Sequence, residues 1–194
     1  MQEHLRPALV VVALSTALLG IAAPLAFVGG AQALAPHAAG GSLLTLNGKI
    51  VGSSLIGQNF TGAGYFHGRP SATTAPDPKD SSKTVPAPYN AASSSGSNLA
   101  PTSAALVSRV KADAAGNSDI PADAVTTSAS GLDPDISPEN AARQVARVAD
   151  ARHLARPAVQ ALVDRWTTPP LLGIFGAARV DVLRLNMAMD AASR

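Results

Sequence analysis

The residue types that could do chemistry in this chain do not form an obvious catalytic set. There is no H-E-x-x-H zinc motif, no G-x-S-x-G turn for a nucleophilic serine and no G-x-x-x-x-G-K-[ST] phosphate loop. Gly62-Ala63-Gly64 begins like a dinucleotide loop, but Gly68 falls one place too late. No two of the four histidines are four residues apart: His4, His37, His67 and His153. The sequence therefore predicts no metal site and assigns no cofactor.

Carboxylates gather at one place, around Asp133-Pro134-Asp135 and Glu139. They could serve a cation, but their spacing is not that of a calcium loop, and Pro138 stands where the glycine of such a loop should be. A turn followed by the N-terminus of a helix is the favoured interpretation.

Two other patterns could bind an anion. Arg143 and Arg147 are four residues apart and share one face of a predicted helix, where a solvated face is the simpler interpretation. The Gly/Ser segments 95–98 and 128–131 could present backbone N–H groups to an anion, although tight turns explain them as well.

The longest apolar run of the chain is Ala8–Val28, which has no charged side chain. It would fix the position of all later residues relative to a membrane. Its 21 residues would make a helix long enough to cross a hydrocarbon core of about 30 Å. Eleven of them are Leu, Ile, Val or Phe, which supply roughly −3 to −7 kcal/mol of insertion free energy. We predict a cytoplasmic N-terminus at 1–7, a transmembrane helix at 8–28 and one extracytoplasmic domain at 29–194.

A cleaved signal peptide is the rival interpretation, because Ala31-Gln32-Ala33-Leu34-Ala35 resembles a cleavage site. The apolar run is longer than a signal h-region, which favours an uncleaved anchor. Arg6 precedes the run and no Lys or Arg follows it until Lys49, so the positive-inside rule places the N-terminus in the cytoplasm.

Composition limits what the remaining chain can do. About 160 residues suffice for one modest domain. The chain has no Cys, which excludes disulfides, thiol chemistry and zinc–cysteine sites. The net charge of +2 is too small to indicate a nucleic-acid partner.

The front of the domain contains one hairpin signal and one long low-complexity segment. Asn47-Gly48 separates two short apolar runs, which predicts two antiparallel strands joined by a two-residue turn. Residues 62–101 are rich in Gly, Ser and Pro and read as a loop. Forty residues without structure are unusual in a compact domain, so this segment is either functional or partly ordered.

The C-terminal half of the domain, from residue 102 onward, is predicted to contain helices and one strand. We predict helices at 102–112 and 138–155, the second with Ser137 as N-cap and an apolar stripe of Ala141, Ala142, Val145, Val148 and Ala149. Pro157 interrupts this helix or starts another, whose stripe is Val159, Leu162, Val163 and Trp166 and which ends at Thr167–Pro170. Residues 180–185 look like a strand whose alternation slips near Leu183. The predicted fold class is α+β.

Several short motifs, each weak alone, occur together in the order typical of one family. They are Arg6–Leu9, Gly52–Phe60, Tyr65–Ala72, Tyr89-Asn90, Ser95–Leu99, Thr127–Pro134, Ile136–Pro138, Gln144, Arg147–Ala149 and Leu185-Asn186. In this respect the chain resembles the C subunit of the potassium-transporting Kdp P-type ATPase, from about residue 6 to 190. It departs at Asp181, where the family usually has Asn, and at Ala23, where an aromatic is common.

The resemblance implies an accessory, non-catalytic subunit of a high-affinity potassium pump in the plasma (inner) membrane. Its expected partners are a channel-like A subunit, a catalytic B subunit and the lipid bilayer. In that family ATP is used by the complex, and the C subunit has been proposed to help assembly and to raise nucleotide affinity. The sequence has no Asp-Lys-Thr-Gly motif for phosphorylation.

The motifs, together with the small residues of the apolar run, supply candidate contact residues. They are Gly20, Gly68, Arg69, Pro70, Ser71, Ser97, Asn98, Ser130, Gly131, Asp133, Gln144 and Arg147. Arg69 is the only Lys, Arg, Asp or Glu between Lys49 and Asp77. Two alternatives stay open, a membrane-anchored extracytoplasmic enzyme or binding protein of unknown substrate and a secreted soluble protein.

Overall fold

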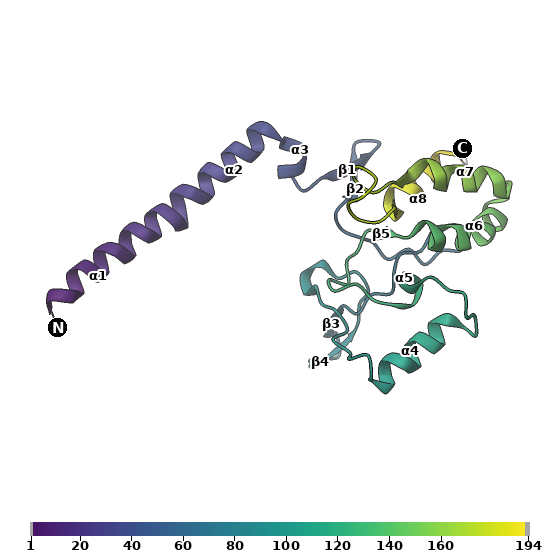
Figure 1. Cartoon of the computed structure of the whole chain (residues 1–194), viewed down its shortest axis with the longest axis horizontal. Helices are drawn as coiled ribbons and strands as arrows, with labels where there is room; N and C mark the ends of the chain where they lie inside the picture. Colours follow the sequence, from purple (N-terminus) through teal and green to yellow (C-terminus); the bar gives the residue numbers. More distant parts are fainter. Residues whose placement is uncertain (1, 193–194) are drawn as a thin grey trace. The chain divides into compact units, whose positions relative to one another are not determined.

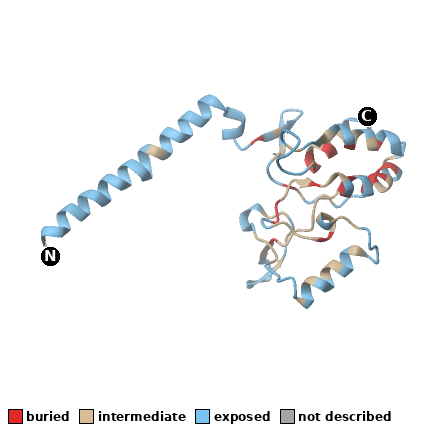
Figure 2. Ribbon diagram, in the orientation of Figure 1, coloured by how far each residue is buried: buried red, intermediate tan, exposed pale blue. Residues whose placement is uncertain are grey.

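The computed structural model describes residues 2–192 (Figure 1). The described chain divides into two compact units, one up to Val51 and one from Gly52 onward. In the first unit, α1 (Gln2–Ser15), the π-helix η1 (Thr16–Ala22) and α2 (Ala23–Leu34) follow one another without a break. The stretch Glu3–Leu34 is 32 residues long, apolar enough to cross a membrane, and none of it is buried (Figure 2). The predicted span 8–28 lies inside this longer helix.

Pro24 gives a physical reason for the π-helical turn. Proline has no N–H, and its ring clashes with the carbonyl four residues earlier in a regular α-helix. In η1 the Ala23 N–H instead donates to the Leu18 carbonyl, five residues back, which widens the turn immediately before Pro24. Gly20 lies within this widened turn.

The chain continues with the short helix α3 (Pro36–Ala39) and the paired strands β1 (Leu43–Leu46) and β2 (Lys49–Ser53). The last two residues of β2 belong to the second unit. Asn47 and Gly48 both have positive φ, 51° and 75°, as a two-residue hairpin turn requires. The predicted hairpin is confirmed.

The first half of the second unit holds few regular elements. The strands β3 (Thr74–Asp77) and β4 (Asp80–Pro86) form an antiparallel hairpin, followed by the 3₁₀ turn η2 (Ala91–Ser93). The segment 62–101 is therefore partly ordered, one of the two possibilities that its composition left open. The helix α4 (Ala104–Ala114) confirms the helix expected at 102–112, although none of its residues is buried, and the short α5 (Ala122–Val125) follows.

The second half holds the core. Its elements are β5 (Asp135–Ile136), α6 (Pro138–Arg152), α7 (Arg156–Trp166), β6 (Thr167–Thr168), β7 (Arg179–Asp181) and α8 (Val182–Ala192). β7 pairs antiparallel with β5 on one side and β6 on the other. Most of the buried side chains lie on α6, α7 and α8 (Figure 2). The mixture of helices and short antiparallel strands fits the predicted α+β class.

Local signals set the boundaries of α6 and α7. The Ser137 hydroxyl accepts the Asn140 N–H at 3.1 Å, which confirms the predicted N-cap. α6 ends at Arg152 rather than at 155 because His153 adopts a left-handed φ of 57°. Pro157 lies in the first turn of α7, so it starts a new helix.

Two sequence expectations are wrong. Ala142 is exposed, and the buried face of α6 includes Gln144 instead. Residues 182–185 belong to α8 and not to a strand. The Asp181 carboxylate accepts the Arg184 N–H at 2.8 Å and so caps the N-terminus of α8. From this point buried side chains recur with the helical period of 3.6 residues and not with the strand period of 2. The buried residues of α8 are Val182, Leu183, Leu185, Asn186 and Met189.

Candidate functional site

The segment around Phe66 has no regular structure, and two side-chain amides hold it against the helices. The Asn186 Oδ1 atom accepts the Phe66 N–H at 2.8 Å, and its Nδ2 donates to the Phe66 carbonyl at 2.9 Å. Gln144 does the same for His67, at 2.8 Å and 3.0 Å. Each amide pairs both backbone groups of one residue, as a neighbouring strand would. We call these two pairs the amide clamps.

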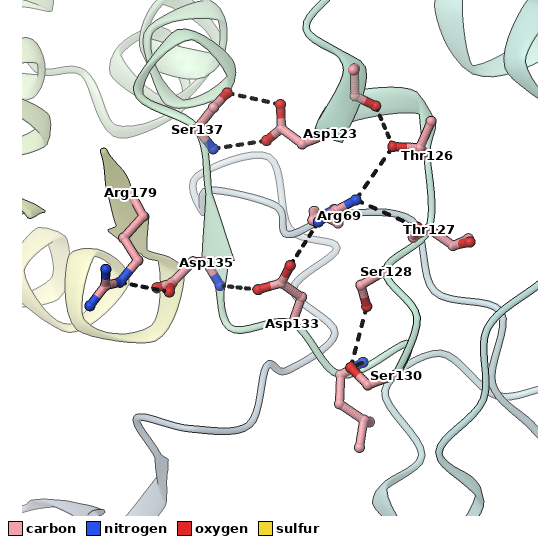
Figure 3. Close-up of polar contacts among 12 residues, drawn as sticks. Arg69, Asp123, Thr126, Thr127, Ser128, Ser130, Asp133, Asp135, Ser137 and Arg179 are labelled. Carbon is pink, nitrogen blue, oxygen red and sulfur yellow. Dashed lines mark hydrogen bonds and ion pairs between the residues drawn. The ribbon is translucent and has the colours of Figure 1, made fainter. Parts of the chain in front are cut away.

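The clamps set the position of Arg69, which is the centre of a polar network (Figure 3). Its Nη1 atom lies 2.8 Å from Asp133 Oδ2, and both side chains are only about a quarter exposed, at 23% and 26%. Nη2 donates to the Thr126 hydroxyl and the Thr127 carbonyl at 3.4 Å and 3.5 Å. Asp133 also accepts the Asp135 N–H at 3.1 Å, so one ion pair joins the Arg69 segment to β5.

Tyr89 packs over the same segment. Its hydroxyl donates to the Arg69 carbonyl at 2.8 Å. Burial raises the pKa of the Tyr89 phenol to about 12, with a further contribution from the Asp133 carboxylate, so it stays a donor. A Cβ atom at Gly68 would overlap the Tyr89 hydroxyl, and one at Gly57 would overlap its ring. The two glycines therefore allow Tyr89 to approach the backbone.

The predicted Gly/Ser segments lie side by side. The Ser95 N–H donates to the Ser130 carbonyl at 3.0 Å, and a Cβ atom at Gly96 would lie 2.9 Å from the Ala129 carbonyl oxygen. Gly131 has a φ of +67°, and its carbonyl accepts the Ser71 hydroxyl at 2.7 Å.

The backbone of the second segment is already used internally. The Gly131 N–H donates to the Ser128 hydroxyl at 2.9 Å, and the Leu132 N–H donates to the Ser130 hydroxyl at 3.1 Å. These contacts favour the tight-turn interpretation over an anion nest. Ser97 is half-buried, and Asn98 is exposed with a φ of 51°.

The carboxylates at 133–139 do not converge on a cation. Asp133 pairs with Arg69, and Asp135 pairs with Arg179 at 3.1 Å. Burial and the nearby Asp181 carboxylate raise the pKa of Asp135. Within residues 2–192, no group of three or more His, Cys, Asp or Glu side chains could hold a metal ion.

Two clefts flank Arg69, which lines both. The larger, about 1000 Å³, is bordered by α5, β5 and the start of α6, and its walls include the two ion pairs named above. The smaller, about 620 Å³, is bordered by the clamped segment and the polar face of α6, including His67, Arg143 and Arg147. We call the smaller one the α6 cleft.

The structure thus brings most of the predicted contact residues into one region. Asp133 pairs with Arg69, and the Ser71 hydroxyl donates to the carbonyl of Gly131. Gly68, Pro70, Gln144 and Arg147 line the α6 cleft together with Arg69. Ser130 accepts the Leu132 N–H in the turn that precedes Asp133. Gly20 lies in the other compact unit.

Sequence reasoning missed the roles of Asn186 and Asp123. The Asp123 carboxylate accepts the Ser137 N–H and the Ser137 hydroxyl, both at 2.8 Å (Figure 3). It also accepts an Asn140 amide hydrogen at 3.0 Å. A polar residue at a core position of a helix is the signal that could have pointed to Asn186 and Gln144, since buried amides need partners.

These features define the class of protein. It has one helix long and apolar enough to cross a membrane, and a small mixed α/β domain in which side chains of the helices hold the loops. Residues 5–191 match the family described as KdpC: K⁺-transporting ATPase, c chain. Three curated relatives carry the name potassium-transporting ATPase KdpC subunit. The Methylobacterium nodulans protein is 58% identical over 196 residues, 98% of each chain. The Methylorubrum populi protein is 55% identical over 200 residues, all of both chains. The Rhodopseudomonas palustris (strain TIE-1) protein is 55% identical over 199 residues, 100% of this chain and 99% of its own.

The chain belongs to the KdpC family. The resemblance drawn from its motifs is confirmed.

Proposed function

We propose that this chain is an accessory, non-catalytic subunit of an ATP-driven potassium uptake pump. It supports the assembly and activity of a channel-like A subunit and a catalytic B subunit. The observation that carries the proposal is the match over nearly the whole chain, at 55–58% identity, to proteins named as KdpC subunits.

In this proposal residues 8–28 of the helix Glu3–Leu34 cross the plasma (inner) membrane as an uncleaved anchor. Arg6 precedes its apolar stretch, and the next Lys or Arg is Lys49, so the N-terminus is cytoplasmic and the domain extracytoplasmic. The helix should resist alkaline carbonate extraction, and protease added from outside should digest the domain. Release of the intact chain into the carbonate supernatant would contradict the anchor.

This topology determines whether the subunit can contact ATP directly. ATP is cytoplasmic, and only about the first seven residues lie on that side. Any effect of the subunit on nucleotide affinity is therefore transmitted through the assembled pump. The purified chain, free of the B subunit, should hydrolyse no ATP above a buffer control.

The contact residues are proposed from the family motifs and their placement. Small residues let membrane helices approach closely, where packing drives association. Gly20 is one such residue, and a Cβ atom there would meet only Thr16 Cγ2, at 3.7 Å. In the domain, the Arg69 network and the wall of the α6 cleft are the proposed contact surface.

Gly20→Leu tests the role of the anchor. The change keeps the helix apolar, so insertion should persist, while the added side chain should separate the helix from a neighbour. We expect reduced co-purification with the A and B subunits in detergent and a parallel fall in potassium-stimulated ATPase activity. Gly30→Leu is the matched control, because it makes the same change ten residues along the same helix, where a Cβ atom meets nothing within 4 Å.

If both variants co-purify at the wild-type level with full activity, the helix is only a tether. If the wild-type chain itself fails to co-purify with any polytopic partner, the proposed function is wrong.

A further inference from the structure

The α6 cleft carries positive charge that the described structure does not neutralise. Arg143 and Arg147 line the cleft from α6, and His67 lines it from the segment held by the amide clamps. Phe60 and Tyr89 supply aromatic surface beside them. The volume of about 620 Å³ is within the range of small-molecule sites and exceeds what a bare inorganic ion needs.

Neither arginine forms an ion pair with a residue in the range 2–192. Arg147 donates to two neutral oxygens, the Ala63 carbonyl at 2.6 Å and Gln144 Oε1 at 2.7 Å. Arg143 donates to Asn140 Oδ1 at 3.2 Å. Among the described residues that line the cleft, Asp113 is the one carboxylate. It forms no ion pair with a described Lys, Arg or His side chain.

Arg143 and Arg147 repel each other, and their charges disfavour the protonated form of His67. Burial lowers the pKa of His67, and the charges of Arg147 and Arg143 lower it further, against the hydrogen bond to the Gly62 carbonyl. Burial and the charge of Arg143 likewise lower the pKa of Arg147. A bound anion would relieve this repulsion.

The larger cleft provides the contrast. Two of its three arginines, Arg69 and Arg179, are neutralised by Asp133 and Asp135 at 2.8 Å and 3.1 Å. Arg143, which lines both clefts, is the third and has no such partner. Among the arginines that line the two clefts, those without an ion pair are therefore the two on the polar face of α6, Arg143 and Arg147.

We propose that the α6 cleft binds an oxyanion, a carboxylate or phosphate group, between Arg143 and Arg147. Guanidinium groups bind such oxygens through paired N–H donors, and hydrogen bonds to charged groups are the stronger kind. Arg143 supplies the donors that are not used in the described structure, and Arg147 is already oriented by Ala63 and Gln144. The oxyanion comes either from a small solute or from an acidic side chain of a neighbouring subunit, and the second source rests on the proposed function.

The first experiment uses the full chain alone, in detergent, with inorganic phosphate and citrate as probes at constant ionic strength set by chloride. The His67 ring is followed by NMR across pH. We expect both probes to raise the apparent pKa of His67, because a bound anion stabilises the imidazolium form.

Arg143→Gln should weaken probe binding by about tenfold or more, since it removes charge-assisted hydrogen bonds. Arg143 is exposed, so the change does not threaten the fold. Arg147→Lys keeps the charge but not the planar donor pair and should weaken binding less. Arg165→Gln is the control, because this arginine is exposed on α7 and lines neither cleft.

The proposal is overturned if neither probe moves the His67 titration, or if Arg143→Gln and Arg165→Gln bind the probes as the wild type does. A second experiment separates the two sources. If an acidic side chain of a partner occupies the cleft, Arg143→Gln also lowers co-purification of the complex, and Arg165→Gln does not. If the anion is a small solute, Arg143→Gln loses the probe and co-purifies normally. Failure of the complex to form bears on the proposed function alone, since the first experiment needs no partner.

Discussion

Replacing Asn186 by alanine should weaken the domain more than any exposed change of the same size. Asn186 is 1% exposed, and its amide pairs with both backbone groups of Phe66, which is completely buried. The alanine variant leaves a buried N–H and a buried carbonyl without the side chain that pairs them. The loss therefore includes the desolvation cost of two groups as well as two hydrogen bonds.

The magnitude follows from those two groups. An unsatisfied buried polar group costs about 1–3 kcal/mol, so the pair gives a loss of about 2–6 kcal/mol in the free energy of unfolding. Domains of this size have total stabilities of about 5–15 kcal/mol. The control is Gln160→Ala on α7, whose side chain donates to Asp164 at the surface and whose loss should cost no more than about 0.5 kcal/mol.

The chain contains its own probe for this measurement. Trp166 is the only tryptophan, and it packs against the core of the second compact unit. Its fluorescence during denaturant unfolding in detergent reports on the domain and not on the apolar helix. Equal shifts of the unfolding midpoint for Asn186→Ala and Gln160→Ala would refute the role of the amide clamp.

Asn186→Asp tests the direction in which stability changes with pH. The carboxylate can accept the Phe66 N–H but, when ionised, cannot donate to the Phe66 carbonyl, so burial should raise its pKa above the unfolded value. A raised folded-state pKa means that stability is present at low pH and is lost as pH rises through that pKa. The variant should therefore be closest to the wild type in acid, whereas Asn186→Ala should show the same deficit at every pH.

Three further changes have defined outcomes. Asp123→Asn should cost about 2 kcal/mol, because it weakens a carboxylate that accepts from Ser137. Burial raises the pKa of Asp123, but its hydrogen bonds outweigh burial and lower that pKa from 3.8. The wild type should therefore lose the stability that the Asp123 carboxylate provides as the pH falls below 3.8 and through the pKa of the folded state, and the Asn variant should not. Gly57→Ala should lower the unfolding midpoint strongly, since the new methyl group would lie 2.5 Å from the Asp133 carbonyl oxygen. His67→Gln should remove a loss of stability below pH 6.5, because a lowered histidine pKa makes protonation unfavourable to the fold. Denaturant titrations across pH check the two titrating sites, and thermal unfolding checks the glycine.

Local sequence signals predicted the elements whose boundaries depend on neighbouring residues. Ser137-Pro138 fixed the start of α6, and Asn47-Gly48 fixed the hairpin, because capping and positive φ are local requirements. The strand expected at 180–185 was wrong for a related reason. Three residues of real strand run directly into α8, and a window that spans both shows neither period cleanly.

The candidate site depended on contacts that no local pattern contains. Gln144 was identified through family resemblance, and its partner His67 lies 77 residues away. Arg69 and Asp133 are 64 residues apart. Pairs of this kind follow from tertiary packing, so the sequence supplied the residues but not their partners.

The amide clamps also determine when the domain can fold. The Phe66–Asn186 contact joins residues 120 positions apart, and α8 is the last described helix of the chain. The segment around Phe66 leaves the ribosome long before its partner exists, and contacts of such sequence separation form slowly. Folding of the second unit therefore cannot be completed until α8 has been synthesised. A truncation before α8 would leave the Phe66 segment without the side chain that pairs its backbone.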